Sequence, residues 1–163
     1  MGGFACGAGV GVAVGVAAGI WFSQRQMKAT SKSKPRCLPI VTTAASPAAG
    51  HYSQAMVNGG EVFISGLLPV TPSGTKLSDA PFAAQANQVL DNLEAVLAAA
   101  GSNLSQLLQV RVYITSIDNW AEFNALYAQR LGGHKPARAV VPVPCLHYGF
   151  LLEVEAMAAN SVQ

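Results

Sequence analysis

The stretch Lys135-Pro136-Ala137-Arg138, followed by the run from Phe150 to Ala158, carries the features that decide the fold. Arg138 enters one apolar run, and Glu153 and Glu155 alternate with apolar residues in the other. Charged side chains in sheet-like apolar segments need a partner or a ligand, because an unpaired buried charge is costly. The two segments therefore predict strands that carry either an ion pair or a binding site.

These two segments are predicted to pair as an antiparallel hairpin closed by residues 144–149. If Val140 faces Glu153, then Arg138 faces Glu155, and the three charged side chains share one face of the sheet. Arg138 and Glu153 would be diagonal neighbours, about 7–8 Å apart at the backbone. That spacing leaves room for a small anion on the guanidinium and a water molecule against the carboxylate. The alternative is a plain ion pair between Arg138 and Glu155.

Composition bounds the class of protein. The chain has 163 residues, 51% of them hydrophobic and 11% charged, which fits one domain with an appendage and a buried subunit interface. No acidic residue precedes Glu61, and the chain after the basic leader is mildly acidic, which argues against a nucleic-acid surface. The cysteines and histidines have no zinc-ligand spacing, so no metal site is expected. The cysteines are Cys6, Cys37 and Cys145.

The first 22 residues form a glycine-rich apolar stretch. Residues 3–22 carry no charge and match the length of a bilayer-spanning helix, with glycine at every fourth position from Gly3 to Gly19. A retained membrane anchor is predicted, in an organelle such as a mitochondrion or plastid or on the cytoplasmic side of a cell membrane. A cleaved signal peptide and an organelle-targeting leader are the alternatives. Residues 23–48 are predicted to be a basic Ser/Thr/Pro linker, and residues 49–160 the globular domain.

Periodicity in the globular part predicts the element order β-β-α-β-α-β-β. This order indicates an α+β mixed sheet with two helices on one face. The opposite face then packs against other subunits, with sites at the subunit junctions. Ser78-Asp79 and Asp118 are predicted helix caps, and Trp120 is predicted to be buried. The predicted strands span residues 52–57, 61–69, 108–114, 139–143 and 150–158. The first helix is predicted to begin within residues 78–81 and to end at Gly101, and the second to follow Asp118 and to end at Gly132-Gly133.

Six motifs come in one order and spacing over about residues 45–160. They are Gly50-His51-Tyr52-Ser53-Gln54-Ala55, Phe63-Ile64-Ser65-Gly66-Leu67-Leu68-Pro69-Val70, residues 85–101, Phe123-Asn124-Ala125-Leu126-Tyr127, Pro136-Ala137-Arg138-Ala139 and Glu153-Val154-Glu155-Ala156. Together they resemble the Rid/YjgF family of reactive-intermediate (enamine/imine) deaminases, and most closely its RidA branch. The resemblance implies a chorismate-mutase-like subunit and a homotrimer with three clefts between subunits. It also implies hydrolysis of 2-imino acids, such as 2-iminopropanoate and 2-iminobutanoate, to 2-oxo acids and ammonia, without metal or organic cofactor.

The resemblance also assigns roles by position. Arg138 corresponds to the arginine that binds the substrate carboxylate, a task that suits the fork of donors on a guanidinium. Glu153, fifteen residues further on, corresponds to the carboxylate that holds the attacking water. Other cleft positions of the family fall on Tyr52, Ser65, Gly66 and Asn124, and the backbone near Gly66 and Val140 would contact substrate.

Several positions depart from the family pattern. His51 stands where the family usually has proline, and Val140 where RidA proteins often have cysteine or threonine. The loop of residues 144–149, with Cys145, His147 and Tyr148, is unlike the usual pattern. A non-catalytic trimeric subunit of a membrane assembly is therefore an alternative to an imine deaminase. A third alternative, an RNA-acting protein, is disfavoured by the low basic charge outside the leader.

Overall fold

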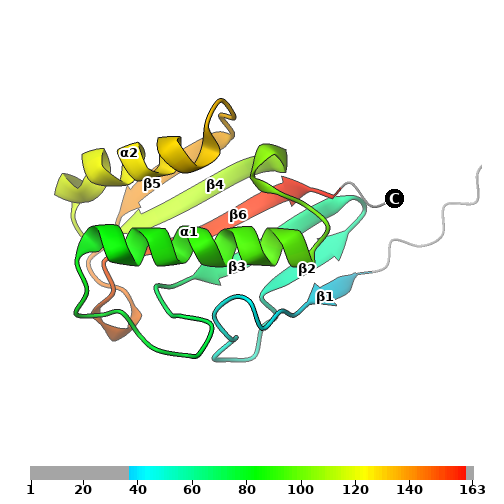
Figure 1. Ribbon diagram of the computed structural model, residues 1–163, viewed down its shortest axis with the longest axis horizontal. Helices are drawn as coiled ribbons and strands as arrows, with labels where there is room; N and C mark the ends of the chain where they lie inside the picture. Colours follow the sequence, from blue (N-terminus) through cyan, green and yellow to red (C-terminus); the bar gives the residue numbers. More distant parts are fainter. Residues whose placement is uncertain (1–36, 161–163) are drawn as a thin grey trace, which may run out of the picture. The chain divides into compact units, whose positions relative to one another are not determined.

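The computed structural model of the chain describes residues 37–160, which form one mixed sheet and two α-helices (Figure 1). The six strands of the sheet follow the order β1-β2-β3-β6-β4-β5. Strand β6 therefore lies inside the sheet, and β5 lies at one edge. The elements are β1 (Leu38–Ile40), β2 (Ala55–Asn58), β3 (Glu61–Leu67), α1 (Phe82–Ala99), β4 (Leu107–Ile114), α2 (Trp120–Leu131), β5 (Ala137–Pro142) and β6 (Leu152–Ala159).

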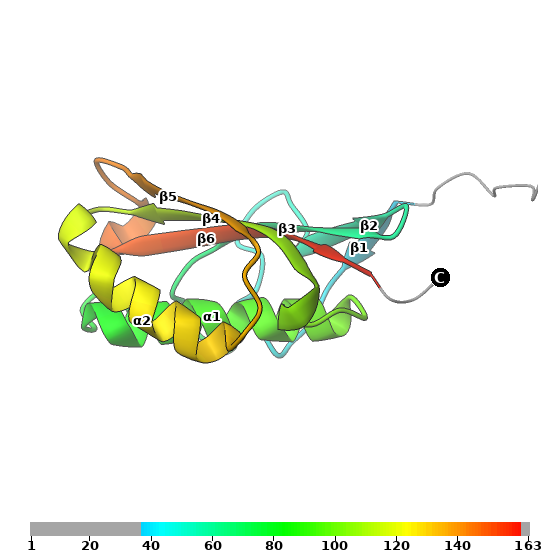
Figure 2. The ribbon, with the colours of Figure 1, turned by 90° about the horizontal axis from the view of Figure 1, so that it is seen from above.

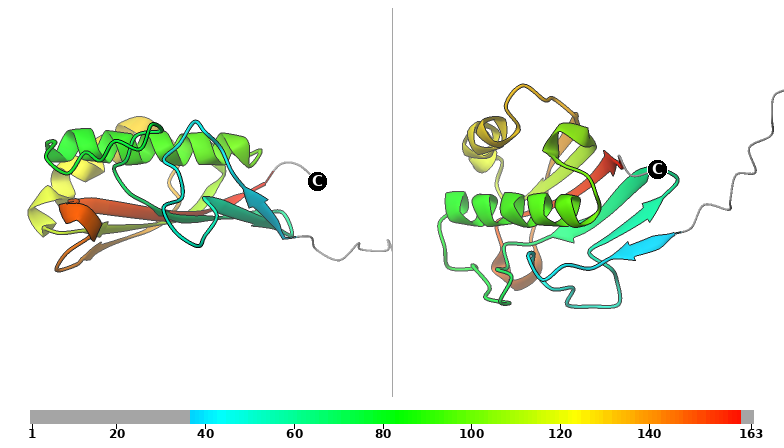
Figure 3. Two further views of the ribbon diagram at one scale, coloured as in Figure 1. Left: turned by 90° about the horizontal axis from the view of Figure 1, so that it is seen from below. Right: turned by 45° about the vertical axis from the view of Figure 1, so that its right-hand side comes forward.

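Both α-helices cover the same face of the sheet, and the other face is bare in the described chain (Figures 2 and 3). The core lies between the two layers. Alternate residues of β6 are buried in it, which is the pattern of a strand with one covered face. The predicted α+β class, with two helices on one face of a mixed sheet, is confirmed. The buried residues of β6 are Leu152, Val154, Ala156 and Ala158, and those of α1 include Leu90, Leu93 and Leu97.

The helix ends follow the predicted glycines but not the predicted caps. Helix α1 ends just before Gly101, whose φ of 72° lies in the left-handed region that glycine tolerates. Its first residue follows Pro81, and no side chain caps it, so the Asp79 cap was wrong. Asp118 is not a cap either, because the Ser116 side chain accepts from its backbone N–H. Trp120, predicted to be buried, is 42% exposed because it begins α2 at the rim of the sheet.

The predicted hairpin between the last two strands was wrong. Strand β5 pairs in parallel with β4, where Arg138 stands opposite the fully buried Val110 and so faces the helices. Strand β6 pairs antiparallel with β4, where Glu153 stands opposite Tyr113 and, alternating with buried neighbours, faces the bare side. Arg138 and Glu153 therefore lie on opposite faces of the sheet within one chain. The physical reason is the β4–α2–β5 unit, since a helical crossover joins parallel neighbours.

The alternative ion pair between Arg138 and Glu155 was also wrong. Glu155 accepts from Arg111 Nη1 at 2.7 Å and from the Tyr113 hydroxyl at 3.1 Å, on the bare face of the sheet. This contact with Glu155 raises the pKa of Arg111, while burial and then Glu155 raise the pKa of Tyr113. The Glu155 carboxylate is thus bound by two side chains of β4. Of the two acidic residues of β6, Glu153 is the one without such a partner among residues 37–160.

Strand β3 carries a bulge at the point where the candidate site begins. Ile64 faces Ala156 and Leu67 faces Val154, so three steps along β3 match two along β6. The extra residue falls at Ser65-Gly66. A bulge of this kind bends the strand and re-aims the residues around it. Here it directs Ser65 and Gly66 toward Glu153 on β6.

The prediction of a membrane-anchored protein is corrected by the structure. No helix among residues 37–160 is long and apolar enough to cross a bilayer. The apolar stretch that prompted the prediction, residues 3–22, lies outside the described residues. Inside the predicted linker, residues 38–40 form β1, which pairs with β2 at the edge of the sheet. This strand was missed because three residues with a central Pro39 give no periodicity.

Candidate functional site

A cavity of about 370 Å³ surrounds the carboxylate of Glu153. The predicted residues Tyr52, Ser65 and Gly66 line it together with Glu153, and so does His147 from the unusual loop. The carboxylate of Glu153 makes no hydrogen bond or ion pair with any of residues 37–160. Burial raises the pKa of Glu153, and Glu155 nearby raises it further, while His147 opposes the change. An unengaged, partly desolvated carboxylate of this kind is suited to hold a water molecule and take its proton.

The position of Glu153 depends on Gly66. A Cβ atom at residue 66 would overlap Oε1 of Glu153 and stand 3.0 Å from its Cδ. The backbone of Gly66 has no left-handed φ, so an added Cβ would disturb the position of the Glu153 carboxylate and not the backbone of the strand. The bulge and the glycine together bring the β3 backbone into direct contact with the acid.

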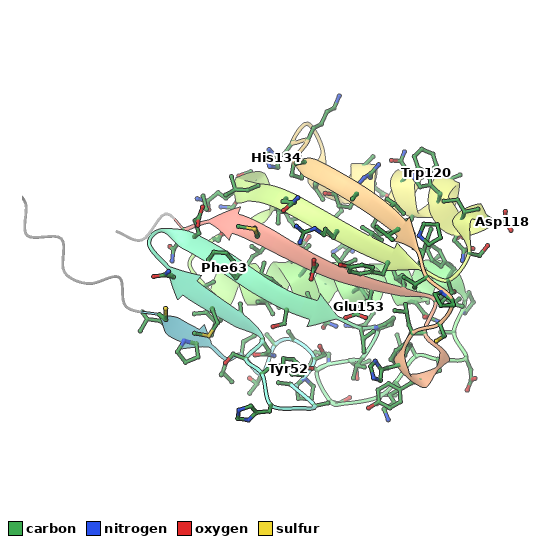
Figure 4. All side chains as sticks on the ribbon, turned by 180° about the vertical axis from the view of Figure 1, so that it is seen from behind. Tyr52, Phe63, Asp118, Trp120, His134 and Glu153 are labelled. Carbon is green, nitrogen blue, oxygen red and sulfur yellow. The ribbon has the colours of Figure 1, made fainter. Side chains whose placement is uncertain are left out.

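Two further residues of this cavity have their polar groups engaged locally. The Ser65 hydroxyl donates to the Ser53 carbonyl at 2.7 Å, which ties the bulge to the segment before β2. The Tyr52 hydroxyl accepts from the Ala49 backbone N–H at 3.3 Å, and its side chain is 49% exposed. Tyr52 therefore forms a wall of the cavity rather than part of the core. Figure 4 shows the face of the sheet away from the helices, with Glu153 on it and Tyr52 at its border.

Arg138 belongs to a second cavity, of about 430 Å³, between α2 and β5. Its Nη2 donates to Asn124 Oδ1 at 2.9 Å, and its guanidinium carbon lies 4.9 Å from the centre of the Tyr127 ring. Among the described residues Arg138 has no carboxylate partner, whereas Arg111 and Arg130 are both in ion pairs. The guanidinium is thus held by an amide oxygen and a ring face, and its remaining donors are available to an anion.

The contact between Arg138 and Tyr127 was not predicted from the sequence. Tyr127 appears in the sequence only as the last residue of the motif that contains Asn124, and its place one turn after Asn124 is the signal that points to Arg138. Burial raises the pKa of Tyr127 to about 12, with Arg138 acting in the opposite direction. Its buried hydroxyl has no hydrogen-bond partner among residues 37–160. Val140, opposite the buried Val112 in β4, shares the Arg138 face of the sheet.

The predicted residues thus form two half-sites. One chain brings together Glu153, Tyr52, Ser65 and Gly66 in the first cavity and Arg138 with Asn124 in the second, but does not join the two. No group of histidine, cysteine and acidic side chains in residues 37–160 could hold a metal ion. The first cavity thus holds a carboxylate, and the second a guanidinium, that has no partner of opposite charge among these residues.

Comparison with known proteins gives one consistent result. The family model described as "Endoribonuclease L-PSP" matches residues 42–160. Protein HMF1 of Saccharomyces cerevisiae is 40% identical over 122 residues, which cover 75% of this chain and 94% of that protein. The 2-iminobutanoate/2-iminopropanoate deaminase of Rattus norvegicus is 33% identical over 122 residues, covering 74% and 89%. The crystal structure of E. coli TdcF with bound serine matches with a TM-score of 0.71 at 34% identity, covering 76% of this chain and 99% of that one.

The mixed sheet, backed on one face by two helices and carrying cavities beside Glu153 and Arg138, defines a small α+β protein. More particularly, the chain belongs to the Rid/YjgF family, as the order and spacing of its motifs predicted. The matched region is the sheet-and-helix domain and excludes the apolar leader.

Proposed function

We propose that the chain hydrolyses 2-imino acids, such as 2-iminopropanoate and 2-iminobutanoate, to 2-oxo acids and ammonia. The observation that carries this proposal is Arg138, a partly buried guanidinium with no acidic partner among the described residues. A cation so placed, and oriented by Asn124, is suited to a ligand carboxylate. The rat deaminase among the relatives acts on substrates of this class, and E. coli TdcF carries a bound amino acid, serine.

The main task of the protein in this reaction is to position the reacting groups. A protonated imine is already electrophilic, so the enzyme has to orient a water molecule toward its carbon and accept a proton from that water. Glu153 has an unengaged carboxylate on a cavity wall, which suits it to both tasks. Tyr52, Ser65 and the backbone of Gly66 would enclose the substrate, and Val140 would contact it through its backbone.

The reacting site is proposed to lie between two copies of the chain in a homotrimer. Arg138 and Glu153 lie on opposite faces of one sheet, so a ligand can touch both only if they come from different subunits. The bare face of the sheet also exposes large apolar side chains, with Phe63 40% and Val141 38% exposed. A sheet face of this kind is commonly covered by a partner.

Activity and affinity can be measured on imines generated in situ by an amino-acid oxidase, with a hydrazide trap competing for the imine. Wild type should accelerate 2-oxo acid formation and reduce the trapped product. Arg138→Ala should raise KM about 10- to 150-fold, because a charged hydrogen-bonded contact contributes about 1.5–3 kcal/mol. Arg138→Lys should recover only part of this, since lysine lacks the fork. Arg130→Gln, which removes a charge from an ion pair on α2, is the matched control.

The shared site predicts complementation between inactive variants. At substrate concentrations well below the wild-type KM, Arg138→Ala and Glu153→Gln should each have little activity alone, but subunits unfolded together and refolded at equal ratio form mixed assemblies. About one junction in four then carries both wild-type residues, so about a quarter of the wild-type rate should return. Failure of the mixture to exceed either variant would contradict a site shared between subunits. Equal activity of wild type and Arg138→Ala would contradict the proposed reaction itself.

A further inference from the structure

We propose that His147 is a second proton-transfer group of this site and supplies the proton that the leaving nitrogen needs. This role rests on the imine hydrolysis proposed above. His147 and Glu153 line the same cavity. The His147 ring makes no hydrogen bond with any part of residues 37–160, whereas His134 Nε2 lies 2.8 Å from the Leu107 carbonyl oxygen. Both ring nitrogens of His147 are therefore available to a ligand in the cavity.

The turn that carries His147 has an unusual backbone. Tyr148 has φ 59° and Gly149 has φ 73°, two consecutive residues in the left-handed region. Of the non-glycine residues that the structure describes, Tyr148 is the only one with positive φ. Tyrosine rarely adopts this conformation, and such conformations persist where surrounding contacts hold them, often at functional sites.

Those surrounding contacts are present. The Lys76 ammonium lies 3.6 Å from the centre of the Tyr148 ring, and the Phe150 ring meets Tyr148 edge-on with centroids 5.7 Å apart. Phe150 is fully buried, so it anchors the end of the turn in the core. The side chain of Tyr148 is itself 51% exposed, so burial does not explain its strained backbone. The contacts of this turn hold His147 at the wall of the cavity.

Hydrolysis of the imine needs a proton donor as well as a base. Water adds to the imine carbon, its proton passes to Glu153, and the C=N electron pair moves to nitrogen, giving an NH₂ group. Protonated His147 then gives a proton to this nitrogen. The hydroxyl oxygen forms the carbonyl, the C–N bond breaks with its electron pair leaving on ammonia, and the hydroxyl proton returns to His147. Glu153 passes its proton to ammonia, so the products are the 2-oxo acid and an ammonium ion.

The charges around His147 fit a site in which Glu153 accepts a proton and His147 donates one. The titratable groups that share its cavity are Glu153, Tyr52 and Tyr148, and Lys76 lies over the Tyr148 ring. The charge of His147 lowers the pKa of Glu153 against the effect of burial. When it carries a proton for the second step, His147 thus partly offsets the effect of burial on Glu153.

The test compares His147→Gln with His51→Gln in the full chain, using the oxidase-coupled assay over a range of pH. His51 is exposed and is not among the residues that line the cavity, so its substitution is the matched control. His147→Gln should lower kcat about 10²-fold with little change in KM, because the His147 side chain transfers a proton and does not bind the substrate carboxylate. The acid limb of its pH profile should move to higher pH, since the pKa of Glu153 rises without the neighbouring cation.

Chemical rescue separates proton transfer from a structural role. Imidazole added to His147→Ala should restore part of kcat, whereas a merely structural defect would not respond. If the wild type is active and His147→Gln has the same rate and pH profile, the role of His147 is overturned but the proposed reaction is not. A wild type as inactive as Arg138→Ala would overturn both. A slow His147→Ala that imidazole does not rescue would also overturn the proton-transfer role.

Discussion

Substituting Gly66 by alanine should disable Glu153 without unfolding the chain. The added methyl carbon would overlap Oε1 of Glu153 and approach its Cδ to 3.0 Å, well inside the 3.5–4.0 Å of ordinary carbon contact. The atoms that it strikes are the end of a flexible side chain that can turn away, so the loss of stability should lie at or below the low end of the about 1–3 kcal/mol typical of overpacking, where 1 kcal/mol is roughly 4 °C of Tm for a domain of this size. The carboxylate must move, and loss of a positioned base lowers kcat about 10²- to 10⁴-fold.

The assay measures both Tm and the oxidase-coupled rate. Gly133→Ala is the matched control, because a Cβ at Gly133 meets nothing within 4 Å and the residue has no left-handed φ. In a Glu153→Ala background, Gly66→Ala should cost little further stability, since the atoms it would strike are gone. Wild-type rate and Tm in Gly66→Ala, or equal Tm losses with and without the Glu153 carboxylate, would refute the reasoning.

Three further predictions concern stability and the arginine. Burial raises the pKa of Glu153 above its unfolded value, so ionisation of this carboxyl destabilises the folded chain as pH rises. Glu153→Gln should therefore raise Tm at pH 7, and the difference in Tm should vanish below about pH 4. An equal gain in Tm at both pH values would contradict this. Tyr127→Phe should leave KM unchanged because the Tyr127 hydroxyl has no partner in the described part of the chain, whereas Tyr127→Leu should raise KM by about 2- to 30-fold by removing the ring beside Arg138. Gln85→Leu should lower the free energy of unfolding by at least about 2 kcal/mol, measured by denaturant titration, because the buried Gln85 side chain accepts from the Leu151 N–H and donates to two carbonyls.

The elements of the fold could be predicted from the sequence because each has a local signature. The apolar positions of α1 recur at helical spacing, and Gly101 marks its end. The pairing of β5 and β6 could not be predicted in the same way, since closeness in sequence favours a hairpin. The residue types of the two strands indicate which of them lies at the edge of the sheet and which lies inside it. Ala137 and Ala139 suit an edge, whereas the fully buried Leu152 and Val154 require neighbours on both sides.

The candidate site was predictable as a set of residues but not as a geometry. The motifs pointed to Arg138 and Glu153, yet the parallel crossover through α2 turns the arginine toward the helices. The contacts that position these groups were not predicted, because they join side chains on different elements, whose packing the sequence pattern does not specify. Tyr127 beside Arg138 is one such contact, and Gly66 against Glu153 is another.

The central place of β6 has a consequence for synthesis on the ribosome. Strands β3 and β4 both bond to β6, which is made after them and after β5 (Figure 1). Until residues 152–159 emerge, the nascent chain presents two open strand edges separated by a gap that nothing else fills, a state prone to cross-pairing with other chains. A chain stopped at residue 151 should therefore aggregate during translation, and its recovery as a monodisperse product would show that the gap closes by some other route.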